Sequence, residues 1–373
     1  MVDIVEKYPF LNGFTQVSEE EFDGLNRRHQ NELTLAFVLT ENRQLSHLLI
    51  DGGNNKTADK QAWFIGFAVD IDEYIAKVIT RLTELDEVKA LKHLIVANVG
   101  LTTLPQSLSQ LQSLTSLEVS QNQLVTLPQS LSQLQSLTLL DISHNQLTTL
   151  PDSVSQLQSL IKLFVLNNQL IALPDSFGQL QNLTVLYVTN NQLTALPDCL
   201  GQLQRLITLD VEGNQLTTLP QSVGQLQNLE RLFVSYNQLT ALPKCVGQLQ
   251  RLSGLYVGCN QLTVLPDSLG KLQSLADLYV FNNQLTALPA SFGQLRNLTH
   301  LDVDDNQLTC LPISIGALQA IEYFEVLGNP VCKDIHKLAY ELNAQSLIRY
   351  LLEIQKPETT QPNQAKVLVL GDE

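Results

Sequence analysis

The sequence is poor in charged and aromatic residues. Charged side chains make up 16% of its 373 residues and aromatic ones 6%, whereas a soluble domain typically has about 25% charged residues. Leucine, glutamine, serine, threonine and asparagine take their place. The chain can therefore bury a large aliphatic core, and disorder along its whole length is excluded.

Other features are missing, and each absence excludes a class of protein. No apolar run approaches the ~18 residues that span a membrane. Residues 1–14 contain acids and a proline, where a signal peptide needs a basic start and an apolar stretch. The net charge of −15 argues against nucleic acid as a partner, because its binding depends on dense lysine and arginine. We therefore expect a soluble, cytoplasmic protein with no membrane span.

The sequence repeats itself with a step of 23 residues. The shared pattern LxxLxVxxNQLxxLPxSxxxLxx covers ten units from Leu91 to Ala320, and a degenerate eleventh unit begins at Ile321. Such self-similarity is typical of a solenoid that stacks one short structural unit. The first unit has Val99 where the later units have an asparagine, and these structural asparagines are Asn122, Asn145, Asn168, Asn191, Asn214, Asn237, Asn260, Asn283, Asn306 and Asn329.

Each part of the unit has a structural role. In Leu117-Glu118-Val119 the alternation has a period of two, which predicts a short strand whose leucine and valine face one side. Stacking the units pairs these strands and joins their apolar faces in one core. The asparagine has a donor and an acceptor, so it can satisfy the backbone where the chain turns inward. The proline ends the strand, and SxxxLxxL returns over the outer side as a helical or irregular turn.

This pattern resembles the leucine-rich-repeat family, from Leu91 to about Pro330. The LPxSxxxLxxL half is similar to the 23-residue intracellular subtype. The resemblance implies an α/β repeat solenoid, which is a right-handed horseshoe with a parallel β-sheet on its concave side and helical caps at both ends.

The two ends of the chain lack the repeat. Apolar residues at helical spacing in Asp70–Leu85 predict a helix that covers the first unit. Residues 1–90 are either such a cap, which we favour, or a small α/β domain. A second helix within Asp334–Gln355 is expected to cap the solenoid of residues 91–330, as part of a cap over residues 331–355.

The last residues of the chain resemble the start of another domain. Residues 356–364 have the composition of a polar linker, and AKVLVLGDE follows. A strand that runs into glycine begins the phosphate-binding loop GxxxxGK[ST], whose first glycine would be Gly371. Repeats, cap, linker and strand together are similar to the Roco family, in which a Ras-like GTPase domain follows the repeats. Residues 356–373 are then the linker and first strand of a truncated GTPase domain; the alternative is an ordinary buried strand before a turn.

The residues between the leucine and valine of each strand form a central column on the expected concave face. Aromatic residues are scarce in the chain, yet they hold five of the eleven positions, with acids at both ends. Grouped exposed aromatics favour protein binding, and acids favour a partner with basic groups. The column consists of Ile95, Glu118, Asp141, Phe164, Tyr187, Asp210, Phe233, Tyr256, Tyr279, Asp302 and Glu325.

We predict that a protein or peptide ligand, or an adjacent GTPase domain of the same chain, binds this face. The alternative is that the rings merely stack on one another across the strands while the acids keep the face soluble. The candidate protein-binding residues are Phe164, Tyr187, Asp210, Glu212, Phe233, Tyr236, Tyr256, Tyr279, Phe281, Asp302, Asp304 and Asp305.

No catalytic residue, cofactor or metal site is predicted. The segment Asp302–Asp305 lacks the glycine and distal glutamate of an EF-hand loop. His144 and Cys259 are five units apart, which is about 24 Å at the ~4.8 Å spacing of strands and too far for a Cys–His pair. The five cysteines are an odd number, so a complete disulfide framework is excluded. Two functions remain: a non-catalytic scaffold that serves as the recognition arm of a Roco-type GTPase, or the N-terminal fragment of an enzyme that hydrolyses GTP.

Overall fold

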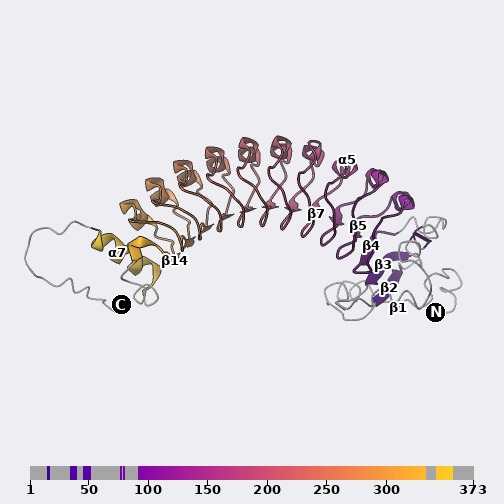
Figure 1. Ribbon diagram of the computed structural model, residues 1–373, viewed down its shortest axis with the longest axis horizontal. Coiled ribbons are helices and arrows are strands. Elements are labelled where there is room, and N and C mark those ends of the chain that lie inside the picture. Colours follow the sequence, from indigo (N-terminus) through magenta and orange to yellow (C-terminus); the bar gives the residue numbers. More distant parts are fainter. Residues whose placement is uncertain are drawn as a thin grey trace, which may run out of the picture.

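The computed structural model of the chain is an arc-shaped solenoid (Figure 1). Strands line the inner side of the arc, and short helices stack along its outer side. The residues that the structure describes are 15–16, 34–39, 45–51, 76–77, 79, 91–332 and 342–355.

Among the described residues, one sheet of fourteen strands runs along the solenoid, and its strands follow the order of the sequence. The pairing advances by one repeat at each step, so that Leu232 lies between Leu209 and Leu255. Equivalent residues of all units therefore form columns across the sheet. The strands of the repeats are parallel and comprise β4 (His93–Ala97), β5 (Ser116–Glu118), β6 (Leu139–Asp141), β7 (Lys162–Phe164), β8 (Val185–Tyr187), β9 (Thr208–Asp210), β10 (Arg231–Phe233), β11 (Gly254–Tyr256), β12 (Asp277–Tyr279), β13 (His300–Asp302) and β14 (Tyr323–Glu325).

The outer side of each unit is a single short helical turn. Proline precedes these turns in an extended conformation, as Pro105 does with φ −69° and ψ 145°, and so ends the preceding segment. The turns are η3 (Gln106–Gln110), η4 (Gln129–Gln133), α5 (Asp152–Ser155), η5 (Phe177–Gln179), η6 (Asp198–Gln202), η7 (Gln221–Gln225), η8 (Lys244–Gln248), η9 (Asp267–Lys271), η10 (Ala290–Gln294) and η11 (Ile313–Ala317), and the 3-10 turn η12 (Pro330–Cys332) follows the last strand.

An aliphatic core fills the space between the sheet and the outer turns. In one unit, Leu117, Val119, Leu124 and Leu131 are at most 1% exposed, and the matching residues of the next unit are buried as well. A fully buried leucine or valine contributes about 1.5–3 kcal/mol relative to an exposed one. The prediction of a repeat solenoid with a concave parallel sheet is confirmed.

A ladder of asparagines joins each unit to the unit before it. Asn145 donates through Nδ2 to the backbone oxygens of Val119 and Ile142, each at 3.0 Å, and its Oδ1 accepts from Leu124 N at 2.9 Å. All ten asparagines make the same contacts, and none is more than 9% exposed. In the first unit Val99 is buried, and its N–H donates to Asn122 Oδ1 at 3.1 Å.

The sheet continues beyond the repeats on the N-terminal side. Strand β3 (Leu45–Asp51) pairs in parallel with β4, β2 (Thr34–Leu39) pairs antiparallel with β3, and β1 (Thr15–Gln16) pairs in parallel with β2. Sequence reasoning allowed strands or a helix in Leu33–Ile50 but did not predict that strands there join the sheet, because residues 1–90 carry no repeat that would fix a register. Of the predicted helix Asp70–Leu85, residues 76, 77 and 79 are described as helical, and Ile79 lies in the core.

A helix covers the other end of the solenoid. Helix α7 (Ala344–Ile354) begins where Asn343 Oδ1 accepts from Ser346 N at 2.9 Å, and it buries Leu347 and Leu351. Gln355, just after it, accepts through Oε1 from Leu311 N at 2.9 Å and so fastens the helix to the last units.

Parts of the predicted organisation lie outside the described residues. They include the linker of residues 356–364, the strand after it and Gly371, so the division of the chain at residues 90, 330 and 355 stays a prediction. Within the described part of the chain, no helix combines the length and the apolar character needed to cross a bilayer.

Candidate protein-binding surface

The register brings the predicted central column together on the inner face of the sheet. Glu118 lies opposite Asp141, Tyr187 opposite Asp210, and Asp302 opposite Glu325. Every candidate residue is at least partly exposed; ten are half-buried, and Tyr236 and Asp305 are exposed. The prediction for Ile95 was wrong: its side chain was expected to be exposed on the concave face but is only 2% exposed. It lies in β4, opposite Leu49 of the N-terminal strand β3, in the part of the sheet that the repeat did not predict.

The aromatic residues of the column form two separate groups. The rings of Phe233 and Tyr256 stack with their centroids 4.4 Å apart, and those of Tyr256 and Tyr279 stack at 5.1 Å, each pair with an interplanar angle of 13°. Phe164 and Tyr187 meet edge to face at 5.3 Å and 62°. Asp210 separates the two groups, so the continuous stack comprises three rings, on β10, β11 and β12.

Two glycines make room for the rings. A Cβ on Gly254 would lie 2.8 Å from Cε2 of Tyr256, and a Cβ on Gly258 would lie 2.5 Å from Cε1 of Phe281. Real Cβ atoms do not approach other atoms so closely, so a side chain at either position would displace the ring beside it. The Gly-Leu-Tyr-Val-Gly sequence around β11 thus leaves room for the rings of Tyr256 and Phe281.

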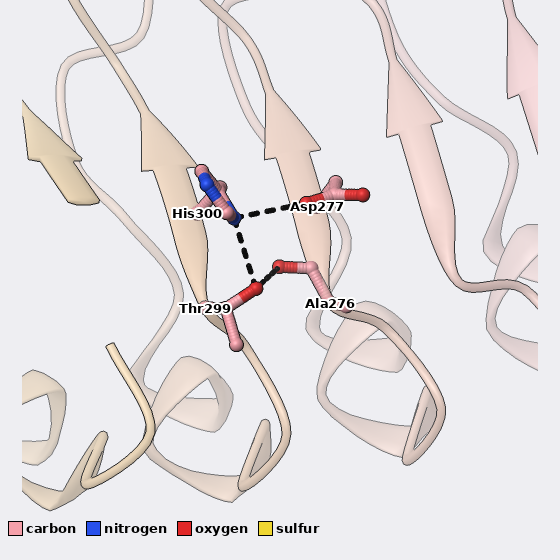
Figure 2. Close-up of polar contacts among 4 residues, drawn as sticks. All are labelled: Ala276, Asp277, Thr299 and His300. Carbon is pink, nitrogen blue, oxygen red and sulfur yellow. Dashed lines mark hydrogen bonds and ion pairs between the residues drawn. The ribbon is translucent and has the colours of Figure 1, made fainter. Parts of the chain in front are cut away.

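A polar cluster on β12 and β13 lies near the stack, because Asp277 stands two residues before Tyr279 on the same strand. Figure 2 shows the residues of this cluster. His300 Nδ1 lies 3.1 Å from Asp277 Oδ1 and 2.9 Å from Thr299 Oγ1. The Thr299 hydroxyl donates to Ala276 O at 3.0 Å, so its oxygen is left to accept a hydrogen bond from the N–H at Nδ1. His300 therefore carries a proton on Nδ1, and its ring stacks on Tyr323 at 4.5 Å and 12°.

Sequence reasoning missed His300 and Tyr323 as residues of this face. Both stand two positions before the central column, and a strand returns its side chains to the same face every second residue. The period of two that identified the central column was therefore also the signal for this second column, which contains Arg231, Gly254, Asp277, His300 and Tyr323.

Carboxylates gather on β13 and β14, beyond the ring stack. Burial, together with the negative charges of Asp304 and Glu325, raises the pKa of Asp302 to about 6. Burial and the charge of Glu325 likewise raise the pKa of Asp304 to about 6. Asp302 Oδ1 accepts from Asp304 N at 3.0 Å, and Asp304 Oδ1 accepts from Leu327 N at 2.6 Å, so the backbone holds both groups in place.

A second acidic pair lies on the other side of the stack. Asp210 and Glu212 occupy the same two repeat positions as Asp302 and Asp304, and Asp210 Oδ1 accepts from Glu212 N at 3.0 Å. Burial raises the pKa of both carboxyls. The arrangement along the solenoid is therefore an acidic pair, three stacked rings and a second acidic pair.

The described residues contain no cluster of His, Cys, Asp and Glu that suits a metal ion. Burial raises the pKa of Cys199, Cys245 and Cys332. These three thiols are thus kept in their less reactive, protonated form.

Comparison with known families and structures agrees with this geometry. The profile described as leucine rich repeat matches residues 89–147, 114–170, 135–193 and 250–308, and one described as leucine rich repeats in two copies matches residues 181–225. A solved leucine-rich-repeat protein of Leptospira interrogans is 32% identical with a TM-score of 0.61, over 83% of this chain and 88% of that one. The chain belongs to the leucine-rich-repeat family.

Other solved structures share the fold of this leucine-rich-repeat protein. The plant peptide hormone receptor RGFR1, solved in complex with RGF2, is 29% identical with a TM-score of 0.58, over 66% of this chain and 41% of the receptor chain. An internalin of Listeria monocytogenes has a TM-score of 0.62 at 20% identity, over 76% of this chain and 74% of that one, which supports the fold alone. A comparison with curated proteins finds no match.

Proposed function

We propose that this leucine-rich-repeat protein is a non-catalytic scaffold whose concave face binds a protein or peptide that carries basic groups. The observation that carries the proposal is the three-ring stack of Phe233, Tyr256 and Tyr279 between two acidic pairs. Aromatic rings supply large contact areas at little entropic cost. Acids around them attract a basic partner and select against acidic ones.

A relative supports the choice of a peptide or protein as ligand. The plant receptor RGFR1, which is 29% identical to this chain, is solved in complex with RGF2. Ring stacking alone explains the stability of the column, but it does not explain why acids interrupt the column in equivalent positions on both sides of the stack.

The test uses binders selected from a random peptide library displayed against the full chain. Changing Phe233, Tyr256 and Tyr279 together to Ser is expected to weaken the selected binders by more than about tenfold, because the loss of hot-spot rings typically costs ~2 kcal/mol or more. A matched control replaces Val125, Ile171 and Val264, which are 50%, 56% and 59% exposed away from the strands, by Ser. Equal binding by the ring variant and the control would contradict the proposal.

A second proposal concerns the setting in which this scaffold acts. The sequence KVLVLG at residues 366–371 favours a Roco-type protein, in which the repeats are a cytoplasmic recognition arm that acts on an adjacent GTPase domain. The alternative remains that the natural product is an enzyme that hydrolyses GTP and that this chain is its N-terminal part. The genomic sequence after the Glu373 codon tests both: a GxxxxGK[ST] loop in register with Gly371 supports them, and any other continuation contradicts them.

A further inference from the structure

The two acidic pairs of the concave face are copies of one local arrangement. In each pair an aspartate at the end of a strand accepts, through Oδ1, from the backbone N–H two residues later, at 3.0 Å. Asp210 and Glu212 form the first pair, and Asp302 and Asp304 the second. Within the described part of the chain, neither pair has a lysine, arginine or histidine nitrogen within salt-bridge distance. Both pairs are therefore open to cations from outside.

The nearby cations do not neutralise the pairs. His300 is held by Asp277 at 3.1 Å. Burial raises the pKa of the Tyr256 hydroxyl, and the positive charge of Arg231 on β10 opposes that rise only in part. Asp305 and Glu325 add further negative charge at the second pair. The face is thus negative at both ends of the ring stack.

The spacing of the pairs is set by the sheet. Asp210 and Asp302 lie in the same column, and the pairing runs from β9 through β10, β11 and β12 to β13, which is four strand steps. At about 4.8 Å for each step, the pairs are roughly 19 Å apart across the strands. An extended peptide rises about 3.3 Å for each residue, so six residues cover about 20 Å.

An extended peptide also has the matching facial pattern. Its side chains point to the same side at every second residue, so positions i, i+2, i+4 and i+6 face one surface. When positions i and i+6 lie over the two acidic pairs, positions i+2 and i+4 lie over the three stacked rings. Apolar side chains there bury ring surface, while basic side chains at the ends form charge-assisted hydrogen bonds with carboxylates.

We propose that the concave face between β9 and β13 binds an extended peptide segment that crosses the strands, with basic residues six positions apart and apolar residues at the two intervening positions on the same side. The proposal rests on the proposed function, and it adds the direction, the spacing and the side-chain pattern of the ligand. Arginine suits the end positions best, because its planar guanidinium can engage two carboxylate oxygens at once.

The test uses synthetic peptides and the full chain. The probe has nine residues, with arginine at its second and eighth positions, leucine at its fourth and sixth, and serine elsewhere; companion peptides place the second arginine one residue earlier or later. Moving the arginine by one position turns its side chain to the opposite face, so each companion is expected to bind about tenfold more weakly in a fluorescence polarisation titration. Equal affinity for all spacings, or no saturable binding of the probe up to about 1 mM, overturns the proposal.

Variants of the chain locate the peptide. Changing Asp210 and Glu212 to Asn and Gln, or Asp302 and Asp304 to Asn, keeps the side-chain oxygens that accept from backbone N–H groups but removes the charge. Each double variant is expected to weaken the probe by about tenfold, and replacing the arginine that faces the altered pair by citrulline should then add no further loss. The matched control changes Asp198 and Asp267, exposed acids on the outer turns η6 and η9, to Asn. A loss of the same size in this control overturns the proposal.

The outcomes separate this inference from the proposed function. If library-selected peptides need the rings but carry no pair of basic residues six apart, the face binds partners and the spacing rule is wrong. If no selected peptide depends on the rings, both the proposed function and the spacing rule are wrong. If the chain instead self-associates and both acidic variants dissociate it, as measured by analytical ultracentrifugation, the occupant is a second copy and the peptide proposal is overturned.

Discussion

Two columns of the same repeat behave in opposite ways. The asparagine ladder has the same residue in ten successive units, whereas the central column four residues earlier uses five residue types in eleven units. The asparagines are at most 9% exposed and bind the backbone of two units, while the central side chains from Phe164 to Asp302 are half-buried and face the solvent on the concave side. Positions that join the backbones of two units are therefore restricted to one residue, and positions that face the solvent are free to vary. The variation of the central column is where recognition can be encoded.

The largest effect is expected when one asparagine of the ladder is removed. Changing Asn214 to Ala leaves the backbone oxygens of Val188 and Val211 and the N–H of Leu193 without their side-chain partner. Since an unsatisfied buried polar group costs about 1–3 kcal/mol, the free energy of unfolding is expected to fall by about 4 kcal/mol in urea titrations followed by circular dichroism. The exposed neighbour Gln215 changed to Ala is the control, with a change within about 0.5 kcal/mol. An equal effect of both changes would contradict the structural role of the asparagine ladder.

Three substitutions in the central column should lower the free energy of unfolding by less than the single change Asn214→Ala. The variant with Ser at Phe233, Tyr256 and Tyr279 loses two stacked pairs, at about 1 kcal/mol for each pair. We expect its free energy of unfolding to fall by about 2 kcal/mol in the same urea assay. A loss larger than that of the Asn214→Ala variant would mean that the rings are mainly structural.

The carboxylates on β13 should make the stability depend on pH. The pKa values of Asp302 and Asp304 are raised from an ordinary 3.8 to about 6, so the folded state binds these protons more tightly than the unfolded state does. The free energy of unfolding is then expected to fall as the pH rises from about 4 to about 7. Because both groups are partly exposed, the fall is about 1 kcal/mol for each carboxyl.

Replacing both carboxylates should remove this pH dependence of stability. Changing Asp302 and Asp304 to Asn is expected to abolish the pH-dependent contribution of these two groups and to raise stability at neutral pH, as measured by thermal unfolding across the pH range. Stability that rises between about pH 4 and pH 7 in the original chain, and equally in the variant, would contradict the assignment.

The smallest effect on stability is expected at the glycine under a ring. Adding a Cβ at Gly254 meets Cε2 of Tyr256 at 2.8 Å, which is the end of a side chain that can rotate away. The free energy of unfolding of Gly254→Ala should change by only about 0.5 kcal/mol. The near-ultraviolet circular dichroism of the stack should change clearly, because the Tyr256 ring must move away from the new Cβ. An unchanged spectrum would show that Gly254 does not orient the ring.

Repeat spacing made much of this surface predictable. A fixed step between equivalent residues sets the register, and the register alone is enough to place Phe233, Tyr256 and Tyr279 on neighbouring strands. The same reasoning failed at Ile95, which is buried in β4, opposite a strand from a region without repeats. It also could not predict that Phe164 and Tyr187 meet edge to face, because ring orientation depends on local space rather than on spacing.

The contacts of the polar cluster around His300 also could not be predicted from repeat spacing. The period of two is a sufficient signal for Asp277 and His300 on the inner face, although His300 was missed, but their contact depends on the rotamers that Thr299 and Tyr323 permit. Such details arise from side-chain packing between units, and a repeat pattern contains no information about them.

The asparagine ladder also gives the solenoid a direction. Each rung reaches back: Asn329 binds the backbone of the unit that contains Val303, and Asn122 binds Val96. The backbone hydrogen bonds of a unit are therefore completed only when the next unit has folded onto it. During synthesis, which begins at the N-terminus, one unit is completed each time the asparagine of the following unit forms its hydrogen bonds. Shortening the array from the C-terminal side strips the last remaining unit of its partner, whereas shortening it from the other side leaves only an asparagine that water can satisfy. Growth and loss of units are thus not equivalent at the two ends.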